Sequence, residues 1–163
     1  MLWQHKPLNR TIRMKKALLA FTLVFFALSG AFAQIHNPVK WTVATKKLNN
    51  NEAVVFIKAT IENGWHIYST SVPSGGPIAT SFTFAKSNDF TLNGKTMEPK
   101  PQSKYEDTFK MDVPYHNKEV VFQQKIKLNG NKATKVSGTV EFMVCDKTKC
   151  LPPDEYSFSV TVK

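Results

Sequence analysis

The 163-residue sequence lacks the patterns that mark many enzyme active sites. It has no nucleophile elbow, no glycine-rich phosphate loop and no pattern of paired catalytic carboxylates. The histidines His36, His66 and His116 are too far apart in sequence to have metal-ligand spacing. We therefore expect no metal and no cofactor, and nothing in the sequence points to a hydrolase, a nucleotide-binding enzyme or a zinc enzyme.

Arginine is confined to the N-terminal segment, and every basic residue after residue 33 is a lysine. Five of the 22 basic residues and none of the 12 acidic residues precede residue 34, so the net charge of +10 falls to +5 in the remainder. Nucleic-acid-binding domains usually gather arginine and lysine on one face. Because these lysines are scattered through strand and turn patterns, we expect a solvated surface and no binding to nucleic acid.

The N-terminal segment has the layout of a secretory signal peptide. Positive charges between Lys6 and Lys16 precede an uncharged apolar run from Ala17 to Leu28, and Ala31-Phe32-Ala33 forms a small-x-small cleavage site. The apolar run is shorter than the roughly 20 residues of a membrane-spanning helix, which argues against the alternative of an uncleaved membrane anchor. We therefore expect a signal peptide at 1–33, and a monomeric domain at 34–163 in the periplasm of a Gram-negative bacterium.

Apolar and polar residues alternate with a period of two after the signal peptide, and no stretch has the spacing of an amphipathic helix. The expected strands cover Trp41–Val43, Ala53–Ile61, Trp65–Tyr68, Phe82–Phe84, Tyr105–Val113, Val120–Leu128, Val136–Val144 and Tyr156–Val162. Asn-Gly pairs, which favour tight turns, separate several of these segments. The pattern predicts an all-β fold, and about seven to nine short strands favour an immunoglobulin-like β-sandwich.

The two cysteines, Cys145 and Cys150, are the candidate functional residues. In an oxidising compartment they are expected to form a disulfide, which is either structural or redox-active. Closing a loop of about six residues removes only about 2 kcal/mol of unfolded-state entropy, so the bridge adds little stability. Lys147 and Lys149 favour a thiolate, whereas Asp146 opposes it. These residues leave two interpretations open: an exchange module, or a non-catalytic binding module with a structural disulfide.

The alternation also predicts the direction of the first cysteine. If the strand Val136–Val144 stays regular, its even-numbered residues face the core and Cys145 faces outward. An outward sulfur is accessible to another protein, whereas a bulge at the strand end would reverse its direction. Pro152 and Pro153 have no backbone N–H to donate, so we expect them to hold the chain after the second cysteine rigid.

Three groups of residues, in their order, resemble the N-terminal periplasmic domain of the thiol:disulfide interchange protein DsbD. The first group is Asn63-Gly64-Trp65-His66-Ile67-Tyr68-Ser69. The second is Lys104-Tyr105-Glu106-Asp107-Thr108-Phe109 with Val113-Pro114, and the third is Val140-Glu141-Phe142-Met143-Val144-Cys145 with Cys150-Leu151-Pro152-Pro153. The most specific feature is the late cysteine pair on a strand, followed at once by Pro-Pro. The resemblance extends over nearly the whole chain after the signal peptide.

This resemblance implies an immunoglobulin-like fold and a dithiol that passes reducing equivalents from a membrane electron-transfer protein to periplasmic thioredoxin-fold proteins. By the same resemblance, Cys150 forms the mixed disulfide with the partner and Cys145 resolves it. Trp65 and Tyr68 are implied to line the site. The chain would then be a component of a thiol:disulfide oxidoreductase of the protein-disulfide reductase type.

The sequence departs from the family pattern in two respects. It has one residue fewer between the cysteines, and its loop Glu98–Ser103 lacks the aromatic residue that caps the disulfide in the family. Tyr105 is the nearest aromatic candidate to line the site, and Pro152 completes the candidate set. Because the chain ends at Lys163, we expect a stand-alone domain without the membrane-embedded and C-terminal thioredoxin-like domains of the full-length family.

Overall fold

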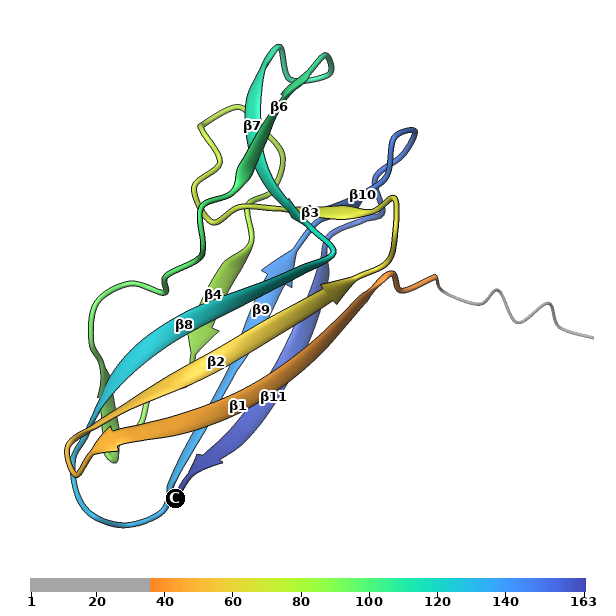
Figure 1. Ribbon diagram of the computed structural model, residues 1–163. Helices are drawn as coiled ribbons and strands as arrows, with labels where there is room; N and C mark the ends of the chain where they lie inside the picture. The colour runs from red at the N-terminus through yellow and green to blue at the C-terminus, as the bar shows by residue number, and fades with distance from the viewer. Residues whose placement is uncertain (1–35) are drawn as a thin grey trace, which may run out of the picture. The chain divides into compact units, whose positions relative to one another are not determined.

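The computed structural model describes residues 36–163, and the expected signal peptide lies outside this range. The described part folds into eleven β-strands without a helix (Figure 1). The strands are β1 (Val39–Asn49), β2 (Glu52–Ile61), β3 (His66–Tyr68), β4 (Ser81–Phe84), β5 (Phe90–Leu92), β6 (Gln102–Glu106), β7 (Met111–Asn117), β8 (Glu119–Leu128), β9 (Thr134–Phe142), β10 (Val144–Cys145) and β11 (Asp154–Val162). Over the same residues, no helix capable of crossing a membrane is found.

Two of the three sheets pack face to face and form a sandwich. One sheet has the strand order β1-β2-β8-β5 and the other β11-β9-β4, and all neighbouring strands are antiparallel. Buried apolar residues from both sheets form one continuous hydrophobic core. This arrangement confirms the predicted all-β, immunoglobulin-like sandwich.

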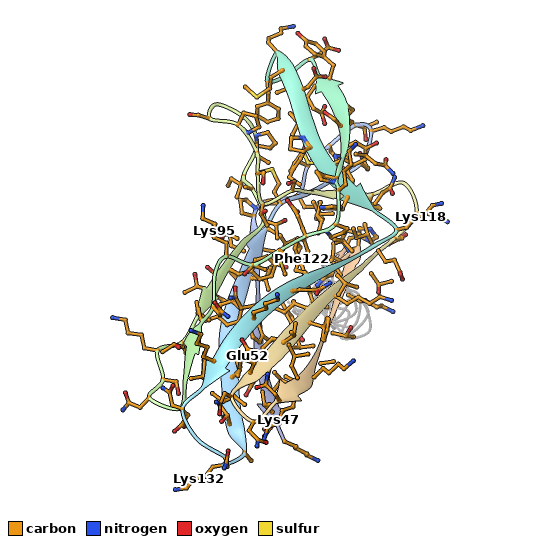
Figure 2. The ribbon with its side chains drawn as sticks, turned by 60° about the vertical axis from the view of Figure 1, so that its left-hand side comes forward. Lys47, Glu52, Lys95, Lys118, Phe122 and Lys132 are labelled. Carbon is orange, nitrogen blue, oxygen red and sulfur yellow. A yellow bond between two sulfur atoms is a disulfide. The ribbon has the colours of Figure 1, made fainter. Side chains whose placement is uncertain are left out.

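The alternating sequence of β8 explains how this strand contributes to the core. Its buried residues are Val120, Phe122, Gln124, Ile126 and Leu128. Phe122 lies between the sheets, with its ring centroid 4.8 Å from that of Phe82 and 6.2 Å from that of Trp41. Figure 2 shows Phe122 inside the molecule, whereas Lys118 and Lys132 lie at its surface.

The third sheet, here called the head sheet, has the strand order β10-β3-β7-β6 and lies beyond one end of the sandwich (Figure 1). Directly paired residues of neighbouring strands share a face of the sheet. Ile67 pairs with both Val144 and His116, and their shared face packs on the sandwich core, where the His116 ring lies 5.9 Å from that of Phe122. The opposite face carries Cys145, so the head sheet has one face for packing and one for the candidate site.

The predicted strand Tyr105–Val113 is wrong, because this segment is the hairpin formed by β6 and β7. The carbonyl of Glu106 accepts hydrogen bonds from the amides of Phe109 and Lys110, at 3.1 and 2.8 Å. Lys110 adopts a φ of 54°, which is uncommon for a residue with a side chain. This turn contains neither glycine nor proline to reveal it in the sequence. This extra hairpin and very short strands such as the two-residue β10 raise the number of strands to eleven, above the predicted seven to nine.

Candidate functional site

The two cysteines form a disulfide at the edge of the head sheet. Cys145 is the last residue of β10, where it pairs with His66 of β3. Cys150 lies directly opposite Cys145 as an isolated antiparallel bridge, with their Cα atoms 4.0 Å apart. The segment 145–150, here called the cysteine hairpin, therefore presents both sulfurs at the same end of the sheet.

The two cysteine residues differ in their exposure to solvent. Cys145 is only 2% exposed, whereas Cys150 is exposed. The predicted direction of Cys145, away from the sandwich core, is confirmed, because Val144 belongs to the core and Cys145 lies on the opposite face of the head sheet. The accessibility expected for its sulfur is wrong, because Cys145 is buried on that face in a cluster with Tyr68 and Val113. The regular strand β9 ends at Phe142, and after Met143 the chain pairs with β3 instead, so that Val144 and Cys145 are both buried. Cys150 is therefore the more solvent-exposed residue of the pair.

The hydroxyl of Tyr68 contacts the disulfide from its buried side. It donates a hydrogen bond to the Sγ of Cys145 over 3.2 Å and lies 4.0 Å from the Sγ of Cys150. Tyr68, Val113 and Cys145 form a small buried cluster. Burial, followed by the neighbouring Glu106 carboxylate, raises the pKa of Tyr68 to about 12. The tyrosine therefore keeps its proton at neutral pH and acts as a hydrogen-bond donor.

Charged and titratable side chains of β6 and β3 lie on the same face as Tyr68. The Oε1 of Glu106 is 2.7 Å from the Nζ of Lys104 and 3.9 Å from the Nε2 of His66. Burial, followed by the charge of Lys104, lowers the pKa of His66 to about 4, although Glu106 and Asp146 act in the opposite direction. His66 is therefore neutral at pH 7, and within residues 36–163 its buried Nε2 has no hydrogen-bond partner.

The other three predicted lining residues, Trp65, Tyr105 and Pro152, lie in three separate parts of the domain. Trp65 belongs to the sandwich core, and the Nζ of Lys149, from the cysteine hairpin, lies 5.9 Å from its ring centroid. Tyr105 is 58% exposed, and the alternation along β6 directs it to the face opposite that of Glu106. Pro152 is exposed in the segment that follows the cysteine hairpin. Tyr68 is thus the predicted lining residue with a contact to the sulfurs.

The sequence did not single out His66, which pairs with Cys145, or Lys104 and Glu106, which lie beside His66 and Tyr68. A signal was present, because His66 and Tyr68 are two residues apart, as are Lys104 and Glu106. This spacing places each pair on one face of a strand. The sequence does not show that β3 and β6 both pair with β7, which is what brings the two pairs together.

A second buried polar cluster ties the head sheet to the loop before β6. One carboxylate oxygen of Glu98 lies 2.8 Å from the Nε2 of His116, and the other accepts hydrogen bonds from the hydroxyls of Ser69 and Thr70. Burial alone would raise the pKa of Glu98, but hydrogen bonds from His116, Ser69 and Thr70 outweigh it and lower the pKa to about 2. Ser69 and His116 both bind the carboxylate rather than each other, which is not the order of a serine nucleophile and its base. We interpret this cluster as structural.

The fold and the site together define an immunoglobulin-like domain with a disulfide at a sheet edge, one of its cysteine residues buried and the other exposed. The profile of the N-terminal domain of the thiol:disulfide interchange protein DsbD matches residues 37–162. The chain belongs to this family.

Solved structures share the fold at low sequence identity. The N-terminal periplasmic domain of ScsB from Proteus mirabilis is 18% identical, with a TM-score of 0.58, over 78% of this chain and 47% of that one. The chain therefore spans about half the length of that domain. The reduced DsbD N-terminal domain of Neisseria meningitidis is 13% identical, with a TM-score of 0.49, over 74% of this chain and 84% of that one. The comparison with curated proteins finds no match.

Proposed function

We propose that this protein is a thiol:disulfide exchange module of the periplasm. Its Cys145–Cys150 pair passes reducing equivalents between a membrane electron donor and thioredoxin-fold partners. The observation that carries this proposal is the unequal exposure of the two cysteine residues. Cys150 is open to a partner, and Cys145 is buried against the hydroxyl of Tyr68.

Reduction of the disulfide begins at the exposed sulfur. A partner's thiolate attacks the Sγ of Cys150, a bond forms between these two sulfurs, and the Cys145–Cys150 bond breaks. The electron pair leaves with Cys145 as a thiolate, which the Tyr68 hydroxyl, 3.2 Å away, stabilises by a charge-assisted hydrogen bond. The partner's second thiolate then displaces Cys150. The partner is oxidised by two electrons, and this protein takes up two electrons and two protons.

Delivery of the electrons to the next partner reverses these steps. The thiolate of Cys150 attacks the partner's disulfide and forms a mixed disulfide. The thiolate of Cys145 then attacks Cys150 and releases the partner as a dithiol. Cys145 is suited to this second step because it lies opposite Cys150 in the cysteine hairpin and is shielded from solvent.

The proposed compartment and partners have separate supports. The signal-peptide pattern of residues 1–33 and the persistence of disulfides in oxidising compartments support the periplasm. Membership of the DsbD N-terminal family supports partners that exchange thiols and disulfides. We further propose that the domain acts as a monomer.

The experiment that tests this proposal is trapping with a thioredoxin-fold probe whose own resolving cysteine is replaced by serine. We expect Cys145→Ser to accumulate a mixed disulfide with the probe, because the attacking Cys150 remains and nothing resolves the adduct. Cys150→Ser is expected to form none, and the variant with both replacements is the matched control. Equal trapping by both single variants would contradict the assigned roles. Trapping by neither would contradict exchange and favour a binding module with a structural disulfide.

A further inference from the structure

The cysteine hairpin is closed by backbone hydrogen bonds that do not involve sulfur. The amide of Asp146 donates to the carbonyl of Lys149 over 2.9 Å. Two positions further from the tip, the amide of Leu151 donates to the carbonyl of Val144, also over 2.9 Å. These two bonds flank the paired positions of the cysteines on either side.

The carboxylate of Asp146 adds three hydrogen bonds to the same hairpin. Its Oδ1 accepts the amide of Thr148 at 2.6 Å, the hydroxyl of Thr148 at 2.8 Å and the amide of Lys149 at 2.8 Å. The bond from the Thr148 amide is the largest of the influences that lower the pKa of Asp146 below its ordinary value. The side chain is therefore an ionised acceptor at neutral pH, and it holds the tip of the hairpin to its first arm.

Reduction of the disulfide removes none of these donors or acceptors, because all of them are nitrogen or oxygen atoms. The rate and equilibrium of ring closure depend on how often the two sulfurs meet in a reactive geometry, which is expressed as an effective concentration. A hairpin that stays closed after reduction keeps this effective concentration high. A hairpin that opens lets the two thiols separate.

We propose that Asp146 is a positioning residue of the exchange reaction, whose carboxylate holds the reduced hairpin closed so that Cys145 and Cys150 readily re-form their disulfide. This inference rests on the proposed exchange function and deepens it. In the step that it assists, the Cys145 thiolate attacks the Cys150 Sγ of the mixed disulfide, and the bond between the two cysteines forms. The bond from Cys150 to the partner breaks, and its electron pair leaves with the partner's thiolate.

The test is equilibration of the purified protein with reduced and oxidised glutathione, which gives the effective concentration of the two thiols. We expect Asp146→Ala to lower this concentration about tenfold, which corresponds to a reduction potential about 30 mV less negative. Asp146→Asn keeps an acceptor oxygen for the same turn, and its value is expected to stay within about threefold of the parent's. Asp89→Ala removes the same charge from an exposed residue outside the head sheet, and this control should leave the equilibrium unchanged.

A second variant keeps the test decisive if Asp146→Ala fails to fold. Thr148→Ala removes the hydroxyl that donates to Asp146 and leaves the charge unchanged. We expect a shift in the same direction as for Asp146→Ala, but smaller, because two of the three bonds remain. An unchanged equilibrium in a folded Thr148→Ala variant would count against the proposal.

Two results would overturn the inference. One is an effective concentration in Asp146→Ala equal to that of the parent protein. The other is an equal shift in Asp146→Ala and Asp146→Asn, since the effect would then come from the lost charge. These failures are distinct from failure of the exchange function, which would appear as a parent protein that forms no mixed disulfide with the thioredoxin-fold probe.

Discussion

The sandwich and the head sheet bury different kinds of side chain. In the sandwich, aliphatic and aromatic residues from both sheets fill the space between them, with Phe122 and Phe142 fully or almost fully buried. In the head sheet, one face joins this core and the other buries the hydroxyl of Tyr68, the imidazole of His66 and the sulfur of Cys145. Burying apolar surface stabilises a fold, whereas burying polar groups costs free energy unless they are paired. We infer from this difference that apolar burial in the sandwich provides most of the folding free energy. That free energy offsets the cost of burying polar groups around the disulfide in the head sheet.

The largest expected effect is that of Phe122→Ala in the sandwich. Because the ring is fully buried against Phe82 and Trp41, its loss should lower the free energy of unfolding by about 3–5 kcal/mol. Urea denaturation measures this change. Leu92→Ala, at an exposed position of β5, is the control and should change the same quantity by less than about 0.5 kcal/mol. A loss below about 1 kcal/mol for Phe122→Ala would contradict the assignment of stability to the sandwich.

The next effect is a pH dependence that originates in the head sheet. His66 is neutral when folded because its pKa is about 4, whereas in the unfolded chain it takes up a proton near pH 6.5. The unfolded state therefore binds more protons between these values, and stability should fall by about 3 kcal/mol as the pH is lowered from 6.5 to 4. Urea denaturation at a series of pH values measures the slope, and His66→Phe should flatten it. An unchanged slope in His66→Phe would assign the dependence to other groups.

A smaller effect is expected when the disulfide is removed altogether. Replacing Cys145 and Cys150 together by serine should lower the free energy of unfolding by no more than about 2 kcal/mol, because the bridge closes a very short loop. Thermal or urea denaturation of the variant and of the parent protein gives the difference. A loss of about 4 kcal/mol or more would mean that the bridge holds the fold together, and would sharpen the case for a structural disulfide.

The smallest effect concerns rate. Tyr68→Phe keeps the ring in place but removes the donor to the Cys145 sulfur, so the departing thiolate is less well stabilised. We expect reduction of the disulfide by dithiothreitol to slow about tenfold, as for the loss of one hydrogen bond to a charged group. Tyr105→Phe removes a hydroxyl from the opposite face of the head sheet and is the matched control. Equal rates for Tyr68→Phe and the control would remove Tyr68 from the mechanism.

The sandwich was largely predictable because its signal is local. Period-two alternation in segments such as Val120–Leu128 shows which side chains are buried, whatever the partner strand is. The prediction of strands and of exposed residues failed at two places that the local alternation does not reveal. A turn that ends in Lys110 with a positive φ interrupts an apparently continuous strand, and the outward face on which Cys145 lies is itself covered, by Tyr68 and Val113.

The site was less predictable because its contacts join distant segments. Tyr68 and Cys145 are 77 residues apart, and no periodicity within either strand reports the hydrogen bond between them. The family resemblance suggested that Tyr68 lines the site but gave no such role to Glu106 or His66, whose place beside Tyr68 depends on the strand order β10-β3-β7-β6. The presence of two cysteines in a chain expected in an oxidising compartment was enough to predict their pairing, whereas their unequal exposure required the structure.

The reduction potential of the Cys145–Cys150 couple tests the central claim most directly. The purified protein is equilibrated in glutathione or dithiothreitol buffers of known potential, and the disulfide fraction is measured by alkylation of the free thiols. An exchange module should have a value among the exchange catalysts, between roughly −120 and −270 mV. A value below about −300 mV would place the bridge among structural disulfides and contradict the proposed exchange of electrons.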